Sequence, residues 1–217
     1  MKGEGLLIVI SGFSGAGKGT LMKRLIEDYQ NYALSISMTT RPPRQGEVEG
    51  REYFFATREQ FEEKIAQDGF IEYASYCGNY YGTPRAYVES QLAAGKDVIL
   101  EIEIQGAMKI KEKYPDALLL FVMPPSAKAL YSRLTGRGTE TEEVIQKRLS
   151  RAAEESVGIE GYDYVMINDD LEQCVRQLHQ LLQDSHLAPV EEYKPVHHIE
   201  FIEEIRKQLQ QLVKGEK

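Results

Sequence analysis

The sequence has no tryptophan and two cysteines, and it has neither a long apolar run nor an excess of basic residues. Cys77 and Cys174 lie far apart without a CxxC or ligand pattern, which excludes a disulfide scaffold or zinc module and indicates reduced, buried thiols. The apolar run at residues 6–10 is about a quarter of a membrane span, and no cleavage site follows it. We therefore expect a cytoplasmic protein without membrane association.

The charge balance also excludes a class of partner. The 217 residues include 26 Lys and Arg against 34 Asp and Glu, a formal net charge of −8, which disfavours sequence-independent binding to nucleic acid. A local basic site for a small anion remains compatible with this balance. The length favours one or two domains with a real hydrophobic core.

Strand and helix patterns alternate along most of the chain. Short β-branched and aliphatic runs predict buried strands, and segments with helical spacing separate them, so we predict an α/β fold with a mostly parallel sheet. Thr83 and Pro84 read as the N-cap and first residue of one helix. The expected strands are residues 5–11, 97–104, 117–123 and 163–167, and the expected helices are 17–28, 84–94, 105–114, 126–134 and 171–183.

Three segments break this alternation. Residues 37–83 are rich in Tyr, Gly, Arg and Thr and suggest a small inserted subdomain. Residues 137–156 suggest a flap that leads into a helix at 140–155. In the tail, residues 189–195 should be extended and 198–213 should form an amphipathic helix that docks on its own domain or on a second subunit. The expected parts are therefore a core (1–36, 84–126 and 157–188), the insert (37–83), a lid (127–156) and a tail (189–217).

Residues 12–18 carry a phosphate-binding motif. They read GFSGAGK, which matches GxxxxGK between an expected strand and an expected helix. Backbone N–H groups there can converge on phosphate oxygens at the positive end of the helix, and Lys18 adds a cation for the β- and γ-phosphates. The strict pattern asks for Ser or Thr where this chain has Gly19, so Thr20 is the candidate ligand of Mg²⁺, directly or through water.

A second anion site is predicted in the insert. Residues 37–53 read SMTTRPPRQGEVEGREY, in which Arg41 and Arg44 flank two prolines on a stiff extended backbone. Guanidinium groups match a phosphate dianion through paired hydrogen bonds. Tyr53 and Tyr81 offer phenolic hydroxyls for the same group.

With these motifs the chain resembles the guanylate kinases, which transfer phosphate from ATP to GMP. The matching pieces are the P-loop, SMTTRPPRQGEVEGREYFF, FIEYASYCGNYYGTP, LEIEIQG, MPPSAKALYSRLTGRGTETEEVIQKRL and YDYVMINDD, between residues 6 and about 187. The resemblance implies a P-loop NTPase core with an inserted α+β GMP-binding subdomain and a helical lid. It also implies Mg²⁺ as cofactor, ATP as donor, and GMP or dGMP as acceptor.

The resemblance assigns residues to both nucleotides. It implies Lys18, Arg41, Arg137 and Arg148 as catalytic cations. The ATP site would comprise Ser14, Gly15, Ala16, Gly17, Lys18, Gly19, Thr20, Arg133, Arg137 and Asn168. The GMP site would comprise Ser37, Arg41, Arg44, Tyr53, Glu72, Tyr81, Gly82, Thr83, Glu101 and Glu103.

Chemistry supports the placement of Glu72 independently of the resemblance. An ionised carboxylate only accepts hydrogen bonds, and guanine offers adjacent N1–H and N2–H₂ donors. Adenine presents a lone pair at N1 and would leave the carboxylate unpaired. Glu101 and Glu103 are expected on one face of an apolar strand, where they orient GMP, hold waters of Mg²⁺ or form an ion pair with Lys18 or Arg41.

Two other functions compete with this interpretation. The spelling GKGT also occurs in adenylate kinases, so another acceptor is an alternative, although the insert at residues 37–83 argues against it. Guanylate-kinase-like domains also serve as non-catalytic binding modules in scaffolding proteins. Those domains often lose P-loop residues, whereas this chain keeps Gly17, Lys18, Arg41, Arg44 and Arg137.

Overall fold

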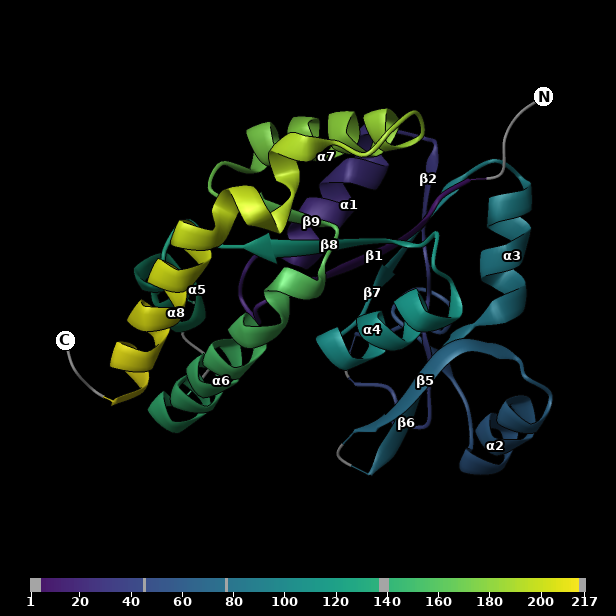
Figure 1. Cartoon of the computed structure of the whole chain (residues 1–217). Coiled ribbons are helices and arrows are strands. Elements are labelled where there is room, and N and C mark those ends of the chain that lie inside the picture. Colours follow the sequence, from purple (N-terminus) through teal and green to yellow (C-terminus); the bar gives the residue numbers. More distant parts are fainter. Residues whose placement is uncertain (1–4, 45, 77, 137–140, 215–217) are drawn as a thin grey trace. The chain divides into compact units, whose positions relative to one another are not determined.

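The computed structural model describes residues 5–44, 46–76, 78–136 and 141–214 (Figure 1). The chain divides into two compact units. Unit 1 comprises residues 1–9 and 29–118, and unit 2 comprises residues 10–28 and 119–217. A five-stranded sheet has the strand order β2-β7-β1-β8-β9, in which β2 pairs with β7 and β8 pairs with β9 in parallel, and this confirms the predicted α/β class. The boundary between the two units falls within β1 (Leu7–Gly12).

Unit 1 holds a parallel strand pair with two helices. Strand β2 (Tyr32–Leu34) pairs with β7 (Asp97–Glu101), and α3 (Arg85–Ala93) and α4 (Ile104–Lys113) follow the strands β6 and β7 in the chain. The buried carboxylate of Asp97 accepts a 2.9 Å hydrogen bond from the Leu6 N–H, which secures the start of the chain.

The insert forms a second, four-stranded sheet within unit 1. Its order is β4 (Phe54–Phe55), β3 (Met38–Thr39), β6 (Asn79–Pro84) and β5 (Phe70–Tyr76), and β5 and β6 form an antiparallel hairpin. Helix α2 (Arg58–Ala66) packs through Phe61, whose ring stacks on Phe70 and Tyr80 at centroid distances of 4.4 and 5.2 Å. This aromatic cluster gives the small sheet its own core.

Unit 2 contains most of the remaining helices. Strand β8 (Leu118–Met123) is buried along its whole length and pairs with β9 (Tyr164–Ile167). Cys174 on α7 is a free, buried thiol whose pKa is raised to about 12 by that burial, as predicted for a structural cysteine. The other elements are α1 (Lys18–Asp28), α5 (Ala127–Thr135), α6 (Glu142–Glu155), η1 (Ser156–Gly161), α7 (Leu171–Ser185), η2 (Glu191–Tyr193), η3 (Pro195–His198) and α8 (Ile199–Lys214).

Most predicted elements are present within two or three residues, and the differences have local causes. Strand β7 ends at Glu101 instead of residue 104, because α4 already begins at Ile104. Residues 189–195 are not extended, since η2 turns within them. Thr83 is not the N-cap of α3, because Pro84 takes that position and the Thr83 hydroxyl bonds elsewhere. The pattern analysis placed no element at β2, α2 or η1.

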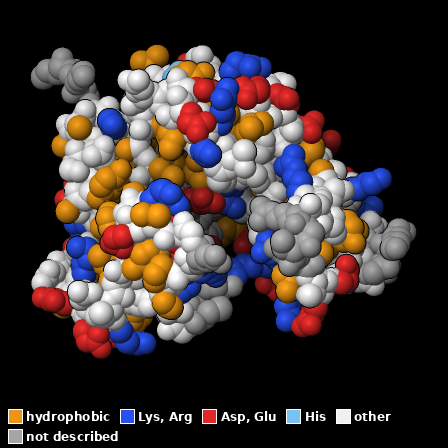
Figure 2. Space-filling view, turned by 180° about the vertical axis from the view of Figure 1, so that it is seen from behind, with side chains coloured by type: hydrophobic (Ala, Val, Ile, Leu, Met, Phe, Trp, Pro, Cys, Tyr) orange, Lys and Arg blue, Asp and Glu red, His pale blue; other side chains and the backbone are white. Residues whose placement is uncertain are grey.

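The surface carries mixed charge. On the face in Figure 2, Lys and Arg side chains are interspersed with Asp and Glu side chains. Among the described residues, no helix is long and apolar enough to cross a bilayer. Helix α8 buries Ile202, Ile205 and Leu209 and packs against α6 and α5 of its own chain. An oligomer built through this helix stays a prediction.

Candidate active site

The loop from Gly12 to Lys18 has the conformation that its glycines predict. Gly15 and Gly17 have φ angles of +93° and +92°, which L side chains rarely adopt. A Cβ at Gly17 would lie 2.6 Å from Asn168 Nδ2, and a Cβ at Gly15 would lie 2.9 Å from Leu134 Cδ2. Both glycines are therefore required by backbone shape and by neighbouring side chains.

The end of β9 supports this loop from the side. Asn168 is 5% exposed, and its amide donates a 2.9 Å hydrogen bond to the Ala16 carbonyl. Arg133 on α5 donates to the Ala16 carbonyl at 3.2 Å and to the Asn168 carbonyl at 2.8 Å. The contacts place both predicted ATP residues at the loop, where they hold its backbone. A contact of Asn168 with adenine stays a prediction.

Two cations lie on the loop itself. The Lys18 ammonium donates to the Gly12 carbonyl at 2.8 Å and to the Phe13 carbonyl at 3.2 Å, so the side chain folds back over the loop. Arg148 on α6 reaches the Ser14 hydroxyl at 3.3 Å. The helix α1 begins at Lys18, which directs its N-terminal N–H groups toward the same place. An anion bound here would meet two cations and a helix terminus.

The start of α1 leaves space for a hydrated cation. Gly19 and Thr20 are exposed, and no heavy atom lies within 4 Å of a Cβ built at Gly19. The described residues contain no cluster of three or more His, Cys, Asp or Glu side chains suited to a metal. Mg²⁺ usually keeps several waters and binds through substrate phosphates with few protein ligands. An open surface with one hydroxyl fits that mode of binding.

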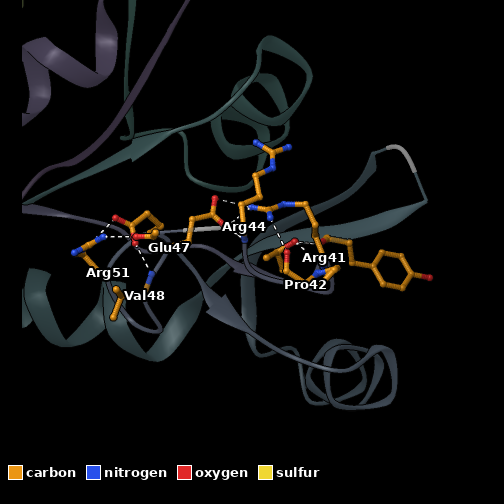
Figure 3. Close-up of polar contacts among 10 residues, drawn as sticks. Arg41, Pro42, Arg44, Glu47, Val48 and Arg51 are labelled. Carbon is orange, nitrogen blue, oxygen red and sulfur yellow. Dashed lines mark hydrogen bonds and ion pairs between the residues drawn. The ribbon is translucent and has the colours of Figure 1, made fainter. Parts of the chain in front are cut away.

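In unit 1, Arg41 is held by an acidic side chain that the sequence analysis left without a role. Its Nη2 donates to both carboxylate oxygens of Glu47 at 2.9 and 3.0 Å, and its Nη1 donates to the Pro42 carbonyl at 2.7 Å (Figure 3). Glu47 also accepts a 2.7 Å hydrogen bond from the Arg44 N–H. The guanidinium and then this N–H hold the pKa of Glu47 below its usual range. Glu47 therefore orients the side chain of Arg41 and the backbone of Arg44.

Tyr53 and Tyr81 lie beside Arg41, as the sequence analysis proposed. The Arg41 guanidinium is 5.4 Å from the Tyr53 ring centroid, and the two tyrosine centroids are 6.0 Å apart. Burial and then the neighbouring Tyr81 raise the pKa of Tyr53, so its hydroxyl keeps its proton and can donate. Arg41, Tyr53 and Tyr81 thus form a donor cluster suited to an anion, with the exposed side chain of Arg44 nearby in sequence.

Glu72 and Thr83 form a second polar group on the hairpin of β5 and β6. The Thr83 hydroxyl is fully buried and donates a 3.0 Å hydrogen bond to Glu72 Oε1. Burial raises the pKa of Glu72, against the effects of Thr83 and of Lys109 on α4. A Cβ at Gly106 of α4 would lie 3.6 Å from Glu72 Oε2. One oxygen of the carboxylate is oriented by Thr83, and the other faces the start of α4.

The alternation of side chains along β6 relates these two groups. Tyr81 and Thr83 lie two residues apart and therefore on the same face, roughly 7 Å from each other. Gly82 lies on the opposite face, where a Cβ would be 2.9 Å from Phe70 and Tyr73. Gly82 is thus required by the aromatic core of the insert, whereas Tyr81 and Thr83 lie on the other face of β6.

The remaining predicted residues have mixed outcomes. Ser37 directly precedes β3, and its carbonyl accepts a hydrogen bond from Phe54. Glu101 ends β7, while Glu103 is the N-cap of α4, so the prediction that both lie on one strand face is wrong. The chain leaves the sheet after Glu101, and both side chains are exposed. The predicted lid cation Arg137 lies outside the described residues.

Glu47 is a residue of the candidate site to which the sequence motif gave no role. The signal was available, because an acid follows the second arginine by three residues at a Gly46 turn with φ +89°. An acidic residue close to two arginines predicts an ion pair that orders them.

The chain matches one protein family over most of its length. A family model described as guanylate kinase matches residues 4–185, so α8 lies beyond the matched segment. The guanylate kinase of Latilactobacillus sakei subsp. sakei (strain 23K) is 44% identical over 198 residues, which cover 89% of this chain and 98% of that protein. The guanylate kinase of Halalkalibacterium halodurans is 50% identical over 185 residues, which cover 85% and 91%. The crystal structure of guanylate kinase from Anaplasma phagocytophilum has a TM-score of 0.67 at 33% identity and covers 85% of this chain and 87% of that one.

Proposed function

The chain belongs to the guanylate kinase family, and from this premise we propose that it transfers the γ-phosphoryl group of ATP to GMP or dGMP. The bond that forms joins a phosphate oxygen of GMP to Pγ, and the bond that breaks joins Pγ to the bridging oxygen, which leaves with ADP. No general base is required, because the acceptor phosphate is already ionised, with a second pKa of about 6.

The observation that carries the choice of acceptor is the partly buried Glu72 carboxylate, which is bonded to the fully buried Thr83. The Thr83 hydroxyl donates a hydrogen bond to one lone pair of Glu72 Oε1. The other lone pairs of the carboxylate can accept hydrogen bonds from N1–H and N2–H₂ of guanine. Its raised pKa indicates that the charge is costly without such donors. AMP would leave it unpaired, and a site built on buried pairing can discriminate by about 10⁴ or more.

The hydrogen-bond donors of Arg41, Tyr53 and Tyr81, together with Arg44, are the proposed binding site of the GMP phosphate. Tyr81 of this cluster lies on the same face of β6 as Thr83, roughly 7 Å away along the strand. None of the proposed contacts involves the 2′ carbon of the sugar, so dGMP should be accepted as well. Residues 37–83 would then act as the GMP-binding subdomain.

ATP is proposed to bind at the loop of Gly12 to Lys18. Phosphoryl transfer spreads negative charge over the equatorial oxygens, and positioned cations stabilise that charge. Lys18 and Arg148 provide such cations, while Asn168 and Arg133 keep the loop backbone in place. Thr20 and the phosphates would hold Mg²⁺, which supplies further neutralisation of the polyphosphate. The transfer is in line, so the attacking oxygen of GMP and the leaving oxygen of ADP lie on opposite sides of Pγ.

A coupled ADP-release assay tests the proposal. With ATP and Mg²⁺ present, GMP and dGMP should support turnover, whereas AMP and UMP should have a kcat/KM lower by about 10⁴. Turnover on AMP equal to that on GMP would refute the role of Glu72. Absence of turnover on every acceptor, with ATP and GMP still bound, would favour the binding-module alternative.

A further inference from the structure

Helix α8 lies outside the segment that matches the family, yet it packs on the two helices that contact the phosphate-binding loop. In Figure 1 it runs beside α6, and its contacts extend to α5 and η1 within unit 2. Its buried face consists of Ile202, Ile205 and Leu209. Two polar side chains of the helix, Arg206 and Gln208, make further contacts with α6, η1 and α5.

Arg206 joins α8 to the C-terminus of α6. Its Nη2 donates to the Ser156 carbonyl and to Glu160 Oε1, both at 2.7 Å, and its Nε lies 3.3 Å from the Ser156 hydroxyl. Ser156 is the C-cap of α6 and is fully buried. Carbonyls at a helix C-terminus lack intrahelical partners, and a cation there also interacts favourably with the helix dipole. Arg206 therefore fixes the end of the helix that carries Arg148.

Gln208 joins α8 to the N-terminus of α5. Its Oε1 accepts a 3.3 Å hydrogen bond from the Ala127 N–H, the first residue of α5. Ser126 already caps the N–H of Ala129 at 3.0 Å, so Gln208 satisfies a second unpaired donor of the same helix. Its amide nitrogen donates to Glu204 at 2.8 Å, which orients the side chain.

The two helices that α8 holds both contact the P-loop. From α5, Leu134 and Leu130 approach Gly15 so closely that a Cβ there would be 2.9 and 3.2 Å from them. From α6, Arg148 reaches Ser14 at 3.3 Å. A shift of either helix would therefore move the groups that face a bound polyphosphate.

We propose that α8 is a positioning element of the ATP site, in which Arg206 and Gln208 act as positioning residues that set α6 and α5 against the loop. The inference rests on the proposed binding of ATP at that loop. Residues of this kind do not contact the ligand, and their substitution typically changes the binding constant of the coupled site by about threefold to thirtyfold. The acceptor residues belong to unit 1, so the expected effect is selective for ATP.

The test compares Arg206→Met and Gln208→Ala with the wild type as full-length proteins. Calorimetric titration with ATP in the absence of GMP should give a Kd raised by about threefold to thirtyfold. KM for ATP should rise by a similar factor, while KM for GMP stays within about twofold. Arg206→Lys keeps the charge near Glu160 and should restore part of the ATP affinity. Lys207→Met is the matched control, because Lys207 is exposed on the same helix and should bind ATP like the wild type.

The outcomes separate this inference from the proposed function. If the wild type itself fails to bind ATP, the proposed function is wrong. If the wild type binds ATP and both variants bind it equally well while melting at lower temperature, α8 is only a structural support and the inference is wrong. Should Arg206→Met fail to fold, Gln208→Ala and Arg206→Lys decide the question by the same two measurements.

Discussion

Replacing Glu72 by Gln removes one charge and almost no volume, so it isolates the chemistry of the acceptor site. The Thr83 hydroxyl can still donate to the amide oxygen, and the side chain should keep its place on β5. The amide nitrogen then faces guanine donors as another donor. The substitution removes one hydrogen bond to a charged group, which contributes about 1.5–3 kcal/mol, and it adds this repulsion. Together these effects should reduce the stabilisation of the GMP transition state by about 3 kcal/mol.

That loss corresponds to a decrease of about 100-fold in kcat/KM for GMP. The coupled ADP-release assay measures it, with AMP as the second acceptor. Because the new amide can donate to N1 and accept from N6 of adenine, the ratio of AMP to GMP turnover should rise. Glu63→Gln on α2 is the control, since Glu63 is exposed in the same unit. The reasoning would be refuted if the kcat/KM of Glu72→Gln for GMP were within threefold of the wild-type value.

The raised pKa of Glu72 gives the same substitution a thermodynamic signature. Burial is the largest cause of the shift, so above the folded-state pKa the ionised group lowers the stability of the protein. Below the unfolded-state pKa the group is neutral in both the folded and the unfolded state, so it no longer lowers the stability of the protein. Glu72→Gln should therefore melt at an equal or higher temperature than the wild type near neutral pH, with an advantage that fades on acidification. In wild type, KM for GMP should rise as pH falls through the same pKa.

Three further substitutions test the donor and acceptor sites separately. Lys18→Met should lower kcat by about 10²–10³ without changing KM for GMP, and an unchanged kcat in steady-state assays would contradict its role. Gly17→Ala places a side chain at φ +92° and against Asn168, so calorimetry should show weaker ATP binding than in the wild type. Chemical denaturation should show a free energy of unfolding lower by about 1–3 kcal/mol. An ATP affinity equal to that of the wild type would contradict this. Glu47→Gln should raise KM for GMP by about tenfold or more with KM for ATP unchanged, since Arg41 loses its partner, and a parallel rise for ATP would count against that explanation.

The loop of Gly12 to Lys18 could be predicted in detail because its conformation depends on residues that are neighbours in the sequence. Residues 12–18 fix strand, turn and helix through glycine spacing alone, and the observed φ angles follow from that spacing. The partner of Glu72 required knowledge of strand pairing instead. Thr83 is eleven residues away in sequence, and only the hairpin of β5 and β6 brings the two side chains to 3.0 Å. Contacts of α8 with residues 127 and 156 are non-local in the same way, and no motif encodes them.

The helices that border the proposed acceptor site differ in their N-terminal caps from several other helices of the chain. Helices α2, α5, α6 and α7 each begin with a side chain that caps a backbone N–H. Helices α3 and α4, which border the proposed GMP site, begin at Pro84 and Glu103 without a side-chain cap. A cap contributes about 1 kcal/mol, so its omission at both helices is a real cost in stability. The Thr83 hydroxyl would have capped α3 but orients Glu72 instead, which is what a site selected for binding a purine, rather than for stability, would require.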